Sequence, residues 1–169
     1  MPYTPFHFGP GMLIKGLIPR QFSLSTFSLA NIVMDVEPLY HLIQGDAQLH
    51  GASHTLVGAA CIAVGTALAA PRMLAYAERR YQKRHSHSDH SMQMSQQQAW
   101  LSALLGSGSH LLLDATMHSD MHMFLPFSAA NPLLHPTWSQ NVYLACVLMG
   151  MTGMLILLLR MHGQFKHPQ

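Results

Sequence analysis

Four polar side chains recur at every fourth position of the segment SHLLLDATMHSDMH: His110, Asp114, His118 and His122. On an α-helix a step of four residues turns a side chain by only about 40°, so at least the first three share one face. Two imidazoles and a carboxylate on adjoining turns can bind one metal ion, or bridge two, if other segments supply further ligands. The alternative is a set of polar caps at a membrane boundary, which would leave Asp114 as a costly unpaired carboxylate in an apolar setting.

Three other segments offer such ligands. His50 and His54 repeat the four-residue spacing directly before an apolar stretch, although a pair of this kind on its own favours two exposed histidines. Asp35 closes an apolar helical run, and Glu37 diverges from it, so only one of the two faces a shared site. His7 stands in TPFHFGPG, where prolines and glycines predict an irregular, turn-rich segment. The flanking aromatics suit a shielded imidazole there as well as a ligand.

The composition indicates a membrane protein, because 9% of the residues are charged and 49% are hydrophobic, whereas a soluble domain has about 25% charged residues. Residues 142–159 and 55–77 are apolar enough to cross a membrane, although Pro71 predicts a kink or an end in the second. Residues 99–114 form a shorter third candidate, rich in small residues. Residues 23–45 predict a further helix with a Ser or Thr start and a Gly stop, whose apolar run is too short to predict a span.

The positive charges predict how these helices are oriented. Residues 79–84 contain the dense basic cluster and Arg160 follows the last apolar stretch, and the positive-inside rule places both in the cytoplasm. The chain then crosses inward over 55–77, outward over 99–114 and inward over 142–159. Every candidate ligand consequently lies at the non-cytoplasmic end of its apolar element. A metal site at the mouth of a helical bundle requires such a convergence.

The sequence also predicts the domain organisation and excludes several functions. Residues 1–169 form a single helical membrane domain, all-α with about four to six helices, in which residues 78–98 form a flexible polar linker. A net charge of +2 with scattered Lys and Arg argues against nucleic acid as a partner. We expect no cleaved signal peptide, because the N-terminus has no basic region followed by an apolar region. The sequence contains no disulfide framework, P-loop, nucleophile elbow or dinucleotide fingerprint. A transporter is disfavoured because mid-span acids are absent, and the oligomeric state stays open.

Several motifs together resemble a known family. These are the start MPYTPFHFGPG, the helix end NIVMDVEP, an H-x-x-x-H-T pair before an apolar span, and GSHLLLDATMHSDMHMFLPFS. They are similar to the YdjM-like family of small bacterial inner-membrane proteins, which are regarded as metal-dependent hydrolases distantly similar to zinc-dependent phospholipase C and P1 nuclease. The resemblance covers most of residues 1–135, and its most specific part is H-x-x-x-D followed by Pro-Phe-Ser.

The resemblance implies a compact all-helical bundle like phospholipase C and P1 nuclease, at least partly transmembrane. It also implies metal ligands at His7, Asp35, His54, His110 and Asp114, with His50 close by. This chain departs from the family pattern in two places: DVEP stands where the family often has an acidic pair followed by His, and Gly51 stands where it usually has Arg. His118, Asp120 and His122 are extra candidates, either as compensating ligands or for a further metal.

The function that follows is a membrane-bound phosphoesterase of the bacterial inner membrane. One to three zinc ions, or another divalent metal, would activate a water that attacks a phosphodiester or phosphomonoester. Asp114, or Asp120 if it is free of metal, would orient that water and act as the base. A lipid headgroup is the substrate that suits a site at the membrane surface. The alternative is a non-catalytic inner-membrane protein that binds metal, or that holds a partner through the basic residues 79–84.

Overall fold

The chain folds into five α-helices and one short 3-10 turn. The computed structural model describes the backbone of residues 4–84, 94–135 and 137–166, and within these ranges it contains no strand. The elements are α1 (Thr4–Leu17), α2 (Leu24–Gln44), the 3-10 turn η1 (Ala52–His54), α3 (Leu56–Arg84), α4 (Gln96–Met117) and α5 (Ser139–Lys166). The prediction of an all-α protein with about four to six helices is confirmed.

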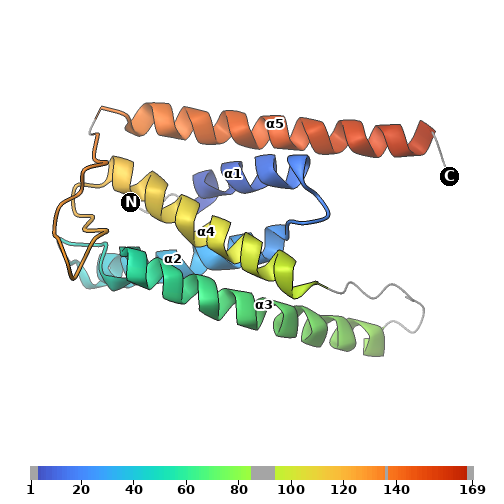
Figure 1. The fold of residues 1–169 in the computed structure, drawn as a ribbon, viewed down its shortest axis with the longest axis horizontal. Helices are drawn as coiled ribbons and strands as arrows, with labels where there is room; N and C mark the ends of the chain where they lie inside the picture. The colour runs from blue at the N-terminus through green and yellow to red at the C-terminus, as the bar shows by residue number, and fades with distance from the viewer. Residues whose placement is uncertain (1–3, 85–93, 136, 167–169) are drawn as a thin grey trace.

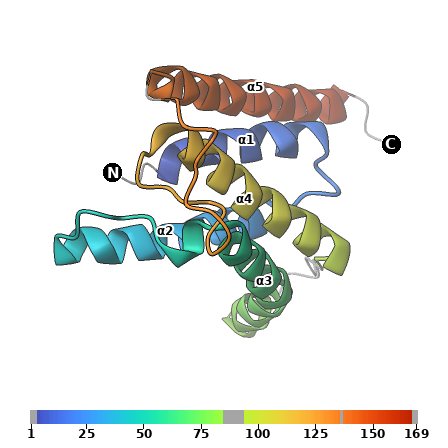
Figure 2. The ribbon, with the colours of Figure 1, turned by 60° about the vertical axis from the view of Figure 1, so that its left-hand side comes forward.

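The chain reverses between successive helices, so that α1, α3 and α5 run one way and α2 and α4 run the other way (Figure 1). One end of the molecule collects the start of α1, the end of α2, η1, the end of α4 and the loop after it. We call this the loop end (Figure 2). The opposite end, which we call the basic end, collects the α1–α2 connection and the C-terminal ends of α3 and α5.

Local sequence signals set the ends of α2 and α4. The Ser23 side chain accepts a hydrogen bond from the Thr26 N–H, and Gly45 ends α2 with a left-handed φ of 78°. Ser95 and Gln98 form a reciprocal capping box at the start of α4. The Ser start and Gly stop predicted for residues 23–45 are therefore confirmed.

The prediction of an irregular segment around His7 was wrong, because α1 is helical from Thr4. Pro5 lies in the first turn, where its missing N–H has no helical acceptor to lose, and the helix continues through Pro10. The glycine that suggested a break is required for packing, since a Cβ on Gly9 would lie 2.0 Å from the Cys146 carbonyl oxygen of α5. Tertiary contact between α1 and α5 thus overrides the low helix propensity of the segment.

Two helices are long and apolar enough to cross a membrane: Leu56–Gln82 in α3 and Ser139–Gly163 in α5. Only 11% of the α5 window is buried, so α5 is no core helix of a soluble fold and exposes apolar surface along its length. The α3 helix continues through Pro71 to Arg84. The segment 99–114, predicted as a third crossing, lies in α4, and α4 is not among the candidate spans in the described part of the chain.

The predicted linker 78–98 overlaps both neighbouring helices. Residues 78–84 are the last turns of α3, and residues 96–98 are the first turn of α4. The histidines 85, 87 and 90 lie outside the described residues.

Candidate metal centre

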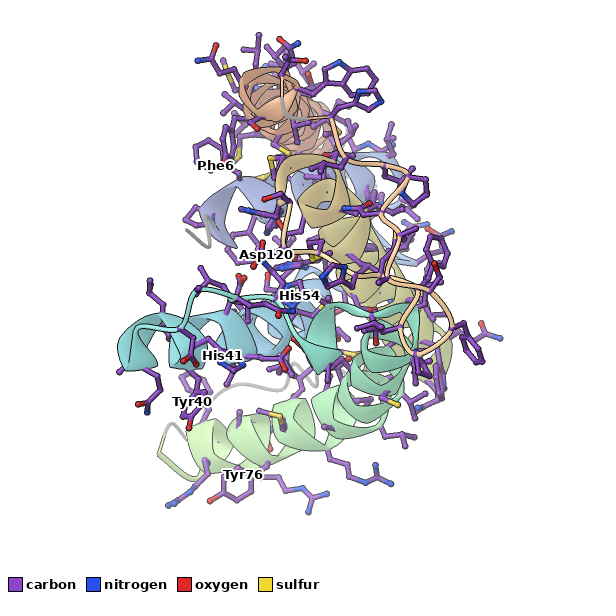
Figure 3. All side chains as sticks on the ribbon, turned by 90° about the vertical axis from the view of Figure 1, so that its left-hand side faces the viewer. Phe6, Tyr40, His41, His54, Tyr76 and Asp120 are labelled. Carbon is purple, nitrogen blue, oxygen red and sulfur yellow. The ribbon has the colours of Figure 1, made fainter. Side chains whose placement is uncertain are left out.

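The buried carboxylate of Asp114 is the centre of a cluster of histidines at the loop end. His7 comes from α1, Asp35 from α2, His50 and His54 from the segment before α3, His110 and Asp114 from α4, and His118 from the cap of α4. Figure 3 looks at this end of the molecule, with His54 and Asp120 labelled close together between the helices. The structure therefore joins residues that are up to 111 positions apart in the sequence, His7 and His118.

Each oxygen of Asp114 faces more than one imidazole. The carboxylate, 3% exposed, is enclosed by the surrounding helices. The distances from ring Nε2 atoms to Asp114 Oδ2 are 3.1 Å for His110, 3.3 Å for His54 and 3.9 Å for His50. The distances to Asp114 Oδ1 are 3.2 Å for His7 and 3.7 Å for His118.

The outer side of the His110 ring is held by Asn31, one turn before Asp35 on α2. The Asn31 Nδ2 donates to the Phe27 carbonyl at 2.8 Å, which turns its Oδ1 toward His110 Nδ1 at 3.0 Å. Because an amide oxygen only accepts, Nδ1 carries the proton. The other ring nitrogen, Nε2, lies 3.4 Å from Asp35 Oδ1 and 3.1 Å from Asp114 Oδ2. Burial lowers the pKa of His110, but the hydrogen bonds to Asp114 and Asp35 outweigh it and raise that pKa to about 9, so Nε2 carries a proton when no metal is bound.

His54 is likewise held at its Nδ1, by a two-step chain. The Ser53 hydroxyl donates its single proton to the Glu37 carboxylate, in a very short hydrogen bond. Its oxygen therefore accepts from His54 Nδ1, at 2.8 Å. Glu37 also accepts from the N–H groups of Ala52 and Ser53, at 2.9 and 2.8 Å, and so fixes the whole η1 turn.

The electrostatics of this hydrogen-bonded group favour an ionised Glu37 and a neutral His54. Burial alone would raise the pKa of Glu37, but the hydrogen bonds from the Ser53 side chain and from the Ser53 and Ala52 N–H groups outweigh it and lower that pKa. Burial lowers the pKa of His54 against the opposing pull of Asp114. A neutral imidazole is the form that binds a metal.

Asp120 holds His50 in the corresponding way. Its oxygens lie 3.0 Å from His50 Nδ1, and its Oδ2 also accepts from the Leu49 and His50 N–H groups at 2.9 and 3.1 Å. Burial opposes ionisation, but these bonds outweigh it and lower the pKa of Asp120 to about 2. Asp120 is thus an ionised acceptor whose lone pairs already face the backbone and one histidine.

Three imidazoles therefore direct Nε2 at carboxylate oxygens, which only accept. The Nε2 atoms of His54 and His110 also face each other at 3.4 Å. Each of these contacts needs either a proton on Nε2, as the raised pKa of His110 provides, or a metal ion in its place. Donor atoms of Asp35, His54, His110 and Asp114 lie within 4.8 Å of one another, as do those of a second group, His50, Asp114 and His118. Asp114 belongs to both groups.

His7 lacks the outer acceptor that holds His50, His54 and His110. Its Nε2 lies 3.2 Å from Asp114 Oδ1, but its Nδ1 is the one buried side-chain nitrogen or oxygen, within the described part of the chain, that has no hydrogen-bond partner. Its ring packs on that of His110, with the centroids 4.1 Å apart. Packing rather than hydrogen bonding orients His7.

His122 does not join the cluster. The helix ends at Met117, so the four-residue period stops after His118, and His122 Nδ1 bonds the Ala129 carbonyl at 2.8 Å within the following loop. The spacing rule fails there because it holds only while the chain stays helical.

Asn31, Ser53 and Glu37 are not among the ligands predicted from the sequence. Asn31 could have been found as a polar residue one turn before Asp35 on the same helix face. The two places where this chain departs from the family pattern, DVEP with its Glu37 and Gly51, also lie next to each other. A Cβ on Gly51 would lie 2.6 Å from Glu37 Oε1. Glu37 and the small residue at position 51 belong to one local arrangement.

Comparison with known proteins identifies the family. No curated protein and no solved structure matches the chain, so the similarity to phospholipase C and P1 nuclease that the resemblance implied stays a prediction. The sequence matches the YdjM inner membrane protein family over residues 18–166, which include every cluster residue except His7. The chain belongs to the YdjM inner membrane protein family.

Proposed function

We propose that the Asp114 cluster binds one to three divalent metal ions, zinc in the first place, and hydrolyses a phosphoester at the membrane surface. The observation that carries the proposal is the shared orientation of the His50, His54 and His110 rings. Each ring has its Nδ1 held by an acceptor, and its Nε2 directed at Asp114. Such outer acceptors are the usual partners of histidines that bind metals.

The donor set fits zinc. Two imidazoles and two carboxylates, those of His54, His110, Asp35 and Asp114, supply the nitrogen and oxygen ligands that zinc accepts in a tetrahedral site. His50 and His118 with Asp114 offer a second position, for which Asp114 would bridge. Bound zinc would supply a water of lowered pKa and a positive charge for a phosphoryl oxygen.

The chain's own residues would admit and orient the substrate from one side. The side chains of His118 and Asp120 are 19% and 26% exposed, whereas those of Asp114 and His50 are 4% exposed. A substrate would therefore approach past His118 and Asp120. Asp114 and Asp120 are the carboxylates that we propose to orient the attacking water. Because the pKa of Asp120 is about 2, its role would be to accept a hydrogen bond rather than to keep a proton.

The helix directions support a multi-pass arrangement in the inner membrane. The candidate spans α3 and α5 run the same way, so the chain must return between them, and α4 is the helix that runs back (Figure 1). If both spans cross, α4 crosses with them, covered by α1, α2 and α3. The cluster would then lie at the non-cytoplasmic surface, where a lipid headgroup is the substrate within reach.

Metal analysis of the detergent-purified protein tests the centre. We expect at least one equivalent of zinc or a similar ion, with loss of metal in Asp114→Asn, because both donor groups lose their shared carboxylate. His122→Ala is the matched control, because His122 bonds the Ala129 carbonyl outside the cluster. This variant should keep its metal. A metal-free wild-type protein would end the metal proposal.

Hydrolysis is tested on the metal-loaded protein. Release of p-nitrophenol from its phosphate mono- and diesters, and of headgroups from phospholipid micelles, should be lost in Asp114→Asn and kept in His122→Ala. A metal-loaded protein inert on this panel would favour the second candidate, a non-catalytic metal-binding membrane protein. The enclosed Asp114, 3% exposed, is the observation that favours this candidate.

A further inference from the structure

A second polar site lies at the basic end, in the surface hollow between the α1–α2 connection and the end of α5. Its polar lining residues are Arg20, Gln21 and Arg160, and its apolar lining includes Leu17, Leu157 and Met161. Arg20 and Arg160 are both exposed. Guanidinium groups beside an apolar wall suit a ligand with an anionic head and a hydrocarbon tail.

The segment that carries Arg20 is fixed from three sides. The Lys15 ammonium donates to the Pro19 and Phe22 carbonyls at 2.7 and 2.9 Å. The Gln98 side chain of α4 donates to the Arg20 carbonyl. The Ser23 N–H donates to Ser102 Oγ of the same helix at 2.7 Å. The Arg20 side chain therefore projects from an ordered turn rather than from a loose loop.

Within the described part of the chain no carboxylate neutralises either guanidinium, since no ion pair there includes Arg20 or Arg160. Arg160 Nη2 donates to the Leu17 carbonyl at 3.3 Å, a contact that places the group while leaving its charge uncompensated. Arg20 has no hydrogen bond from its side chain in the same part of the chain.

The position of the hollow relative to the membrane identifies the ligand class. Arg160 lies near the end of the 25-residue candidate span of α5, and Leu17 and Met161, each 54% exposed, flank it on the apolar side. Basic hollows at the ends of membrane helices are where anionic lipid headgroups bind. We infer that this hollow binds the phosphate group of an anionic phospholipid in the leaflet at the basic end, with its acyl chains along α5. This site is independent of the metal centre and of its proposed activity.

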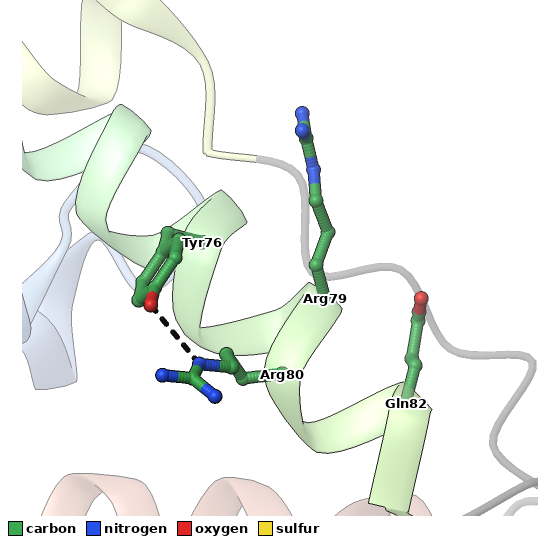
Figure 4. A pocket seen from close by; sticks show the side chains of 4 residues that line it. All are labelled: Tyr76, Arg79, Arg80 and Gln82. Atoms are coloured by element: carbon green, nitrogen blue, oxygen red, sulfur yellow. Dashed lines mark hydrogen bonds between the residues drawn. The ribbon is translucent and has the colours of Figure 1, made fainter.

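The hollow on α3 offers a matched comparison at the same end of the molecule. Among the described residues it is lined by Tyr76, Arg79, Arg80 and Gln82, all from α3, and Arg80 Nε donates to Tyr76 Oη at 3.0 Å (Figure 4). Within this described lining a ligand would touch a single helix flank, and one of the two arginines is already engaged. Arg79 and Arg80 therefore carry similar charge without the two-sided site.

Thermal unfolding in dodecyl maltoside, with native mass spectrometry to count retained lipids, tests the inference on the full chain. Phosphatidylglycerol should raise the unfolding temperature and stay bound, while phosphatidylcholine and inorganic phosphate should not. Arg20→Gln should lose most of that rise, and the double variant Arg20→Gln/Arg160→Gln all of it. Arg20→Gln alone removes no hydrogen bond within the described part of the protein. A folding defect therefore cannot account for a smaller rise in the unfolding temperature.

The double variant Arg79→Gln/Arg80→Gln is the control, and it should keep the phosphatidylglycerol effect. Equal effects of phosphatidylglycerol and phosphatidylcholine would overturn the inference, as would an equal loss in the α3 variant, which would indicate general surface charge. If inorganic phosphate alone reproduced the effect, the hollow would be a site for a free anion and the lipid assignment would be wrong.

Discussion

The two ends of the molecule carry charges of opposite sign. At the loop end five carboxylates, those of Asp35, Glu37, Asp46, Asp114 and Asp120, lie among histidines and backbone N–H groups. At the basic end, among the side chains that the structure describes, Lys15, Arg20, Arg79, Arg80 and Arg160 lie with one acidic residue, Glu78.

The burial of these charges differs as well. Asp114 is 3% exposed and shares its oxygens among five rings, whereas both arginines of the hollow between the α1–α2 connection and α5 are exposed. A buried charge must be compensated within the fold, so its neighbours are specified atom by atom. An exposed charge is compensated by water or lipid, so its neighbours are free to vary. The loop end should consequently respond to single-atom changes that the basic end tolerates.

The largest difference between the ends should come from Asn31→Leu. This change removes the acceptor that keeps the His110 Nδ1 proton in place, without touching any proposed ligand. Loss of such an outer partner weakens metal binding by about 10- to 100-fold, measured by competition with a zinc chelator. Asn31→Asp, which keeps an acceptor oxygen at that position, should restore most of the affinity. Arg79→Gln at the basic end should leave it unchanged. An equal affinity in Asn31→Leu would show that the ring needs no outer partner.

The sequence predicted much of the fold and part of the site. Periodicity and capping residues located α2, and apolar length located α3 and α5, because these signals are local. His110 and Asp114 could be predicted for the same reason, because their four-residue spacing places them on one face of a single helix. The helical α1 was not, because its glycines contact α5, and that contact exists only in the folded chain. Glu37 was set aside for diverging from Asp35, yet the two-residue offset is what lets it reach Ser53 while Asp35 faces His110.

Acid should destabilise the loop end through Asp120. Its pKa is depressed to about 2 in the folded protein, from an ordinary value of 3.8. A depressed pKa means that the stabilisation is complete above about pH 4 and is lost as the pH falls toward 2. In metal-free protein kept in chelator, Asp120→Asn should be less stable than wild type at pH 6, and the difference should shrink from pH 4 to pH 2. Arg80→Gln, at the basic end, should follow the wild-type pH profile. A parallel profile for Asp120→Asn would mean that the carboxylate is not stabilised by its neighbours.

The smallest predicted effect tests whether Glu37 and Gly51 form one unit. An alanine at position 51 would bring its Cβ within 2.6 Å of Glu37 Oε1, so the carboxylate must shift and loosen its hold on Ser53. Gly51→Ala should weaken zinc binding by about two- to fivefold, equivalent to about 0.5 to 1 kcal/mol of coupling. In a Glu37→Ala background the same substitution should have no further effect, because nothing remains at position 37 for the new methyl group to displace. Additive losses in the double variant would show that the two positions act separately, and that the small residue before η1 serves some purpose other than admitting the Glu37 carboxylate.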